Sequence, residues 1–235
     1  MFGTSWWVNE ALAHPSGAFF LTSWIVWIIG SIVLHELGHG WAAIAHGDRT
    51  PIDTGHMTWN PIVHMGAASL LVFALVGIAW GMMPVDPSRF RGRNADAKVA
   101  FAGPLMNLGL AATCILLGGL WLALGKGHIV PSFTAAAKVY TDVGTFFMLG
   151  AGLNLVLAMF NLLPIPPLDG SRIVSSYVRG YRDFVQGPQG MTVMVIGMLA
   201  AWYFIGPRMF VWGFQGAREG MFAVGDILAR GALGP

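Results

Sequence analysis

An apolar segment of membrane length, Phe19–Ala45, carries three ionisable side chains close together: His35, Glu36 and His39. If the segment is a helix with about 3.6 residues per turn, His35 and His39 lie one above the other with Glu36 beside them. An ionisable group in the centre of a bilayer costs roughly 2.5–3.5 kcal/mol, so such a cluster needs a compensating partner. The sequence therefore predicts a functional site inside a membrane helix.

The pattern H-E-x-x-H at residues 35–39 is typical of zinc sites. Two imidazole nitrogens on successive turns bind the ion, a third ligand comes from elsewhere, and the carboxylate accepts a proton from the attacking water. The alternative is a pair of buried histidines bonded to backbone carbonyls, which gives no reason for Glu36 beside them. We therefore expect His35 and His39 to be ligands of Zn²⁺.

The composition excludes a soluble globular protein. Hydrophobic residues make up 55% of the 235 residues and charged residues only 10%. We expect one integral membrane domain over residues 1–235, with the metal-site core at about 17–172 and C-terminal helices at 190–230. A net charge of +2 without a run of Lys or Arg gives no reason to expect nucleic acid as a partner. The single cysteine, Cys114, is expected to pack in the core.

The expected fold is an all-α polytopic membrane protein with about four to six transmembrane helices, a re-entrant hairpin and a few short strands near the site. The candidate spans are Gly17–Ala45, Val99–Leu124, Val143–Leu163 and Gly190–Ile205. The last of these is expected to end at Gly206-Pro207, and residues 210–230 could cross the bilayer or lie along its surface. One or two short strands are expected in the irregular stretch Arg49–Met65, for example at His56-Met57-Thr58-Trp59.

The positions of the basic residues predict the topology. No Lys or Arg occurs before Arg49, so the N-terminus is expected outside and the end of the first helix in the cytosol. The basic loops around Arg89 and Arg172 are expected to be cytosolic as well. Two spans between these loops already return the chain to the same side, so Gly66–Met83 is expected to be a re-entrant hairpin bent near Gly77.

A proline-rich break supplies a candidate for the third ligand. The stretch Asn161–Gly170 contains three prolines and one carboxylate, Asp169. A carboxylate at a break near the bilayer can complete a zinc site and leave the fourth position for water. Taken alone, Asp169 could equally cap the following helix. The incomplete coordination at His35 and His39 favours the ligand interpretation.

Three sequence blocks resemble those of the site-2 proteases, a family of intramembrane zinc metalloproteases. The blocks are His35-Glu36-Leu37-Gly38-His39, then Ala102-Gly103-Pro104 with Asn107, then Asn161-Leu162-Leu163-Pro164 leading to Pro167-Leu168-Asp169-Gly170. The stretch Thr58-Trp59-Asn60-Pro61 with His64 is similar to the compact bacterial branch without a PDZ or cystathionine-β-synthase module, although Met65 follows where that branch has an acidic residue.

The resemblance implies a role for each of five residues. It makes His35, His39 and Asp169 the zinc ligands. It makes Glu36 the general base, and Asn161 a group that orients the substrate or stabilises the oxyanion.

These observations predict a zinc-dependent metalloendopeptidase that hydrolyses peptide bonds in transmembrane segments during regulated intramembrane proteolysis. The expected partners are a membrane-protein substrate with a transmembrane helix and the lipid bilayer, and a homo-oligomer is left open. An edge strand from Thr50–Asn60 is expected to pair with the unwound substrate. The expected location is a bacterial or archaeal inner membrane, with the active site toward the cytosol. The alternative is a catalytically silent membrane scaffold or complex subunit with a structural metal site, which would not need Glu36.

Overall fold

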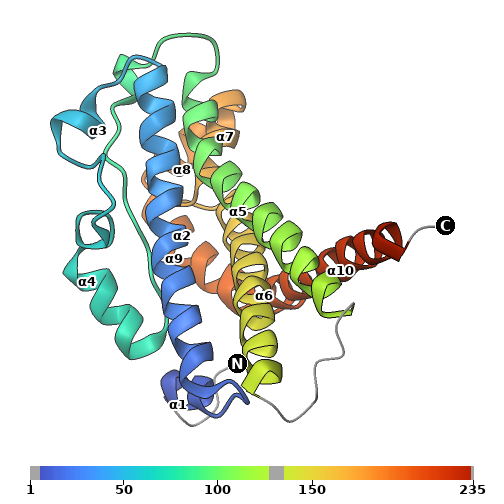
Figure 1. Ribbon diagram of the computed structural model, residues 1–235. Coiled ribbons are helices and arrows are strands. Elements are labelled where there is room, and N and C mark those ends of the chain that lie inside the picture. Colours follow the sequence, from blue (N-terminus) through green and yellow to red (C-terminus); the bar gives the residue numbers. More distant parts are fainter. Residues whose placement is uncertain (1–5, 127–134, 234–235) are drawn as a thin grey trace. The chain divides into compact units, whose positions relative to one another are not determined.

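The computed structural model describes residues 6–126 and 135–233, and the regular elements in these ranges are all helical (Figure 1). In chain order they are α1 (Trp7–Leu12), α2 (Gly17–Ala45), α3 (Thr50–Asp53), α4 (Pro61–Val76), η1 (Pro87–Arg89), α5 (Ala95–Lys126), α6 (Ala135–Asn161), α7 (Asp169–Tyr177), α8 (Arg179–Gln186), α9 (Gly190–Ala200), η2 (Ala201–Ile205) and α10 (Gly206–Leu233).

Four helical stretches among the described residues are long and apolar enough to cross a membrane. They are Gly17–Ala45, Ala95–Gly125, Ala137–Asn161 and Gly190–Arg230. Their number lies within the predicted range, and each contains or overlaps a predicted span.

The prediction of one or two short strands within Arg49–Met65 was wrong, because no described residue lies in a strand. Thr50–Asp53 is α3, and Pro51 stands in its first turn, where a missing N–H costs nothing. The buried carboxylate of Asp48 accepts hydrogen bonds from the backbone N–H of Thr50 at 2.9 Å and from its hydroxyl at 2.5 Å. These local bonds favour a helical turn over an extended ladder.

α4 and the nine residues after Gly77 form a hairpin. Gly77 has a φ of 80°, the left-handed conformation that commonly ends a helix. The chain then returns in extended form over residues 78–86, here called the extended segment (Figure 1). The backbone N–H of Met82 in this segment donates to the carbonyl of His64 in α4 at 2.9 Å. The bend lies where the sequence predicted one, while the position of this hairpin in a bilayer stays a prediction.

The last long helix corrects the prediction that a span ends at Gly206-Pro207, since helix continues from Gly190 to Arg230. Immediately before this dipeptide, Ala201–Ile205 forms a π-helical turn. Pro207 lacks an N–H donor, and its ring would collide with the carbonyl four residues earlier in a regular α-helix. The wider turn relieves this conflict, so the proline does not end the helix.

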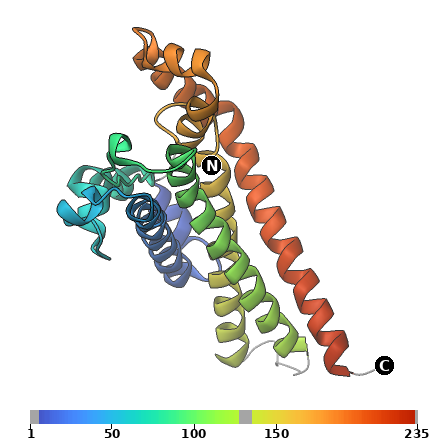
Figure 2. The ribbon, with the colours of Figure 1, turned by 90° about the horizontal axis from the view of Figure 1, so that it is seen from above.

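The chain divides into two compact units, and the prediction of a single membrane domain over residues 1–235 stays a prediction. One unit contains residues 1–28, 109–156 and 210–235, and the other contains residues 29–108 and 157–209. In the first unit, parts of α5, α6 and α10 run beside one another (Figure 2). Cys114, Ala151 and Ala217 form a buried cluster there, so the prediction that Cys114 packs in the core is confirmed.

Candidate metal centre

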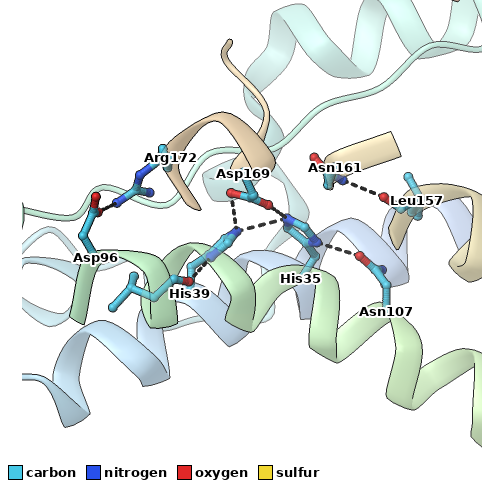
Figure 3. Close-up of polar contacts among 9 residues, drawn as sticks. His35, His39, Asp96, Asn107, Leu157, Asn161, Asp169 and Arg172 are labelled. Atoms are coloured by element: carbon cyan, nitrogen blue, oxygen red, sulfur yellow. Dashed lines mark hydrogen bonds and ion pairs between the residues drawn. The ribbon is translucent and has the colours of Figure 1, made fainter. Parts of the chain in front are cut away.

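Three buried side chains of the second unit converge at one point (Figure 3). His35 and His39 come from α2, and Asp169 is the first residue of α7. One carboxylate oxygen of Asp169 lies 3.1 Å from Nε2 of His35, and the other lies 3.3 Å from Nε2 of His39. The two Nε2 atoms are 3.0 Å apart. The structure thus brings the three predicted ligands together across more than 120 residues of sequence.

α5 orients both imidazole rings. Nδ1 of His39 lies 2.7 Å from the backbone carbonyl oxygen of Val99, and Nδ1 of His35 lies 2.6 Å from the side-chain oxygen of Asn107. Because these oxygens are acceptors, each Nδ1 carries a proton. In a neutral imidazole the other nitrogen then has a free lone pair, so both Nε2 lone pairs face Asp169.

The charges at this point require a cation. The carboxylate of Asp169 is buried, with 8% of the residue exposed. Its Oδ2 atom is buried and receives no hydrogen bond. Two lone pairs and an anionic carboxylate in mutual contact repel one another unless a proton or a metal ion lies among them. Two imidazole nitrogens and one carboxylate oxygen form a donor set that Zn²⁺ accepts, with one position open.

Gly103 allows the backbone of α5 to pass close to the ligands. A Cβ atom at this position would lie 2.6 Å from Nε2 of His35 and would also overlap Nε2 of His39. No side chain fits in this space. The backbone of α5 therefore approaches the ligands closely at Gly103.

Glu36 lies beside the three ligands and is itself buried, with 6% of its surface exposed. The extended segment passes directly against it, because a Cβ atom at Gly81 would lie 2.6 Å from Oε1 of Glu36. The group of atoms that could hold a metal ion contains His35, His39 and Asp169 without Glu36. A buried carboxylate that adjoins the ligands in sequence and stays outside their group is suited to proton transfer.

Asn161 has a different orientation from the one that the resemblance implies. It is the last residue of α6 and is half-buried, and its Nδ2 donates to the carbonyl of Leu157 at 3.0 Å (Figure 3). Its amide N–H is therefore directed along its own helix, and a catalytic role requires the side chain to rotate. Two further histidines contact nearby backbone: a ring nitrogen of His56 lies 3.1 Å from the carbonyl oxygen of Thr54, and one of His64 lies 2.7 Å from that of Thr58.

Sequence reasoning missed several groups that shape this site. The carbonyl of Val99 and the backbone at Gly81 leave no side-chain signal. Asn107 entered the prediction only as part of a block that resembles the site-2 proteases, and its polarity within an apolar helix is the signal that could have identified it as a partner of His35.

Several known proteins are similar to this chain in sequence. The model of "Peptidase family M50" matches residues 23–204, more than half of the chain. A Bacillus subtilis protein named "Putative zinc metalloprotease YwhC" is 36% identical over 156 residues, which cover 66% of this chain and 68% of that protein. A Mycobacterium tuberculosis protein named "Putative zinc metalloprotease Rip2" is 28% identical over 218 residues, which cover 87% of this chain and 78% of that protein. No solved structure matches the chain significantly. The chain therefore belongs to peptidase family M50, the site-2 proteases, and is an integral membrane zinc metalloendopeptidase.

Proposed function

We propose that this protein cleaves peptide bonds within transmembrane segments of other membrane proteins. The observation that carries the proposal is the buried Glu36 carboxylate beside two ligands on a largely apolar helix of 29 residues. His39 lies six residues before the end of α2, about 9 Å along the helix axis. We infer that a bond cleaved at this level of an apolar helix belongs to a membrane segment of the substrate.

The chemistry follows from the positions of the side chains. His35, His39 and Asp169 would hold Zn²⁺, which when bound polarises the scissile carbonyl and lowers the pKa of its bound water to about 7. Glu36 accepts a proton from the attacking water and returns it to the leaving amine, which leaves one carboxyl and one amino product. After rotation of its side chain, Asn161 would donate a hydrogen bond to the substrate carbonyl.

A substrate helix hides its backbone groups in its own hydrogen bonds, so it must unwind before cleavage. We expected the Thr50–Asn60 region to pair with the unwound substrate, but its helical and bent conformation does not suit that role. The extended segment suits it better, because it runs beside Glu36. We place the pairing edge there.

One edge of the extended segment is already bonded to α4. The backbone N–H of Trp80 donates to the hydroxyl of Ser69 at 2.9 Å, and that of Met82 donates to the carbonyl of His64. In an extended chain, alternate residues point their backbone groups to opposite sides. Ala79 therefore presents its N–H and C=O to the other edge, where a substrate strand could add.

A proline at residue 79 tests this pairing without touching the bonds to α4. Ala79→Pro removes one N–H from the free edge and should lower cleavage, while Ala79→Ser keeps that N–H and should not. Zinc content should be unchanged in both variants. Equal cleavage by the two variants would contradict pairing at this edge.

A catalytically silent scaffold is the second candidate, since a metal site can serve structure alone. Structural zinc sites usually have four protein ligands, whereas the described residues supply three. A structural zinc site also does not need a buried carboxylate such as Glu36 beside its ligands.

The test compares the wild type with Glu36→Gln, after purification in detergent and assay of bound zinc. Single-span test substrates should be cleaved by the wild type and about 10²–10⁴ times more slowly by Glu36→Gln, with zinc retained. Glu219→Gln, an exposed change on α10, is the control and should cleave normally. Equal rates for wild type and Glu36→Gln would exclude the assigned base and favour the scaffold.

The substrate class needs a separate measurement. Mass spectrometry of the products should place the cut within the transmembrane span of the test substrate, and an unfolded soluble protein should be a poor substrate. Cleavage restricted to soluble chains would reject the membrane substrate while leaving the metalloendopeptidase assignment intact.

The proposed location is a bacterial or archaeal inner membrane with the metal centre toward the cytosol. The basic residues near Arg49, Arg89 and Arg172 support this orientation. Because the native Cys114 is buried, Arg49→Cys offers one accessible thiol for labelling. A membrane-impermeant maleimide should label it in inverted vesicles and leave it unlabelled in intact cells.

A further inference from the structure

An ion pair fastens the helix that carries Asp169 to the start of α5 (Figure 3). Nη2 of Arg172 lies 2.8 Å from Oδ1 of Asp96. The hydroxyl of Ser176 lies 3.2 Å from Oδ2 of Asp96 and 2.9 Å from the backbone carbonyl oxygen of Arg172, so its one hydrogen is shared between these two acceptors. Arg172 and Ser176 are four residues apart on α7, so they lie on the same face of that helix. One carboxylate in the first turn of α5 thus holds α7 at two points.

α7 depends on such contacts for its position. It has nine residues, too few for a helix that is stable by itself. The linker that joins it to α6 contains prolines at 164, 166 and 167, which have no backbone N–H to donate. Since Asp169 is the first residue of α7, any rotation or shift of this helix moves the carboxylate relative to the imidazoles.

α5 contributes to the position of all three ligands. It contacts His39 through the carbonyl of Val99 and His35 through Asn107. It is connected to the third ligand through Asp96 and α7. The contact of Asp96 with Arg172 therefore completes a set in which one helix fixes every ligand without being a ligand itself.

We propose that Asp96 and Arg172 are positioning residues that align Asp169 with His35 and His39. The inference depends on the metal centre and is independent of the proposed transmembrane substrate. About a third of each side chain is exposed, 37% for Asp96 and 33% for Arg172. An ordinary surface ion pair of this kind contributes little to stability. A large effect on zinc binding would therefore distinguish positioning from general stabilisation.

The experiment measures zinc affinity by competition with a chelator, using the full-length protein purified in detergent and stripped of metal. Asp96→Ala and Arg172→Ala should each weaken zinc binding about 10–100-fold, the usual effect of removing a group that orients a ligand. The exchanged double variant Asp96→Arg/Arg172→Asp should recover most of that loss. Lys138→Ala, which removes another ion pair with an exposed lysine, is the control and should bind zinc like the wild type.

Two results would overturn the proposal: wild-type zinc affinity in both alanine variants, or a loss that the exchanged variant does not recover. If the alanine variants do not fold, Arg172→Lys and Arg172→Met test the same contact, because lysine keeps a cationic donor and methionine keeps only the length. Arg172→Lys should bind zinc more tightly than Arg172→Met. Equal affinities would refute the role of the ion pair. No substrate enters these measurements, so a wrong substrate class cannot affect them.

Discussion

Replacement of Gly103 by alanine tests the geometry of the metal centre most directly. The added Cβ would lie 2.6 Å from Nε2 of His35, whereas an ordinary contact begins at about 3.4 Å. The ring or the helix must therefore move by about 0.8 Å. Zinc–nitrogen distances of about 2.0–2.1 Å tolerate changes of only about 0.2 Å. The required displacement is several times this tolerance, so Gly103→Ala should weaken zinc binding by at least tenfold.

α5 offers a matched control in Gly109, whose Cβ would meet no atom within 4 Å. Alanine is favoured over glycine in a helix by about 1 kcal/mol, so both changes raise the helix propensity of α5 equally. Gly109→Ala should keep full zinc affinity and should unfold at the same temperature as the wild type or a higher one. Gly103→Ala should lose zinc while circular dichroism still shows the same helix content.

The assay is zinc content after dialysis against a chelator of graded strength, measured by atomic absorption. Normal zinc affinity in Gly103→Ala would refute the reasoning, because it would mean that α5 does not pass as close to the imidazoles as the structure indicates. Equal zinc loss in both variants would refute it as well, because the loss would then come from the helix and not from the added Cβ.

Three further predictions follow from other contacts of the second unit. Gly81→Ala should lower cleavage about 10²-fold with zinc retained, because its Cβ displaces Glu36 and not a ligand. Asn107→Ala should weaken zinc binding about 10–100-fold in the chelator assay, because it removes the acceptor of His35 Nδ1. Asp48 has a pKa below its ordinary value: burial opposes this, and hydrogen bonds from Thr50 and the backbone of Asp86 outweigh it. Asp48→Ala should therefore cost about 1 kcal/mol of unfolding free energy at pH 7, and this difference should shrink as the pH falls below about 4.

The parts of the structure that the sequence predicted well depend on local spacing. The first apolar segment has the predicted bounds, Gly17–Ala45, because its composition and length leave no other conformation in a membrane. The contact between His35 and His39 follows from the four-residue spacing of a helix alone. Asp169 could be named as their partner because a carboxylate near an apolar region needs a compensating charge.

The predictions that failed concern segments where two backbone conformations compete. The Thr50 region resembles a strand in composition, yet the carboxylate of Asp48 offers its backbone a nearer hydrogen-bond partner. Gly206-Pro207 is a common end of a helix, but a single wider turn before Pro207 removes the conflict that would end it. Neither outcome could be read from the residues themselves, because each depends on a small difference between two permitted backbone conformations.

The contribution of α5 was hidden for a different reason. A sequence reveals chemistry through side chains, and α5 acts at the metal centre through a backbone carbonyl at Val99 and through the absence of a side chain at Gly103. Its one charged contribution, Asp96, acts at a distance through α7. A helix that positions every ligand and supplies none therefore looks in sequence like any apolar span with a glycine. The role of α5 becomes evident only once its distances to both imidazoles are known. The variants at Gly103 test its contact with the imidazoles, and the variants at Asp96 test its contact with the helix that carries Asp169.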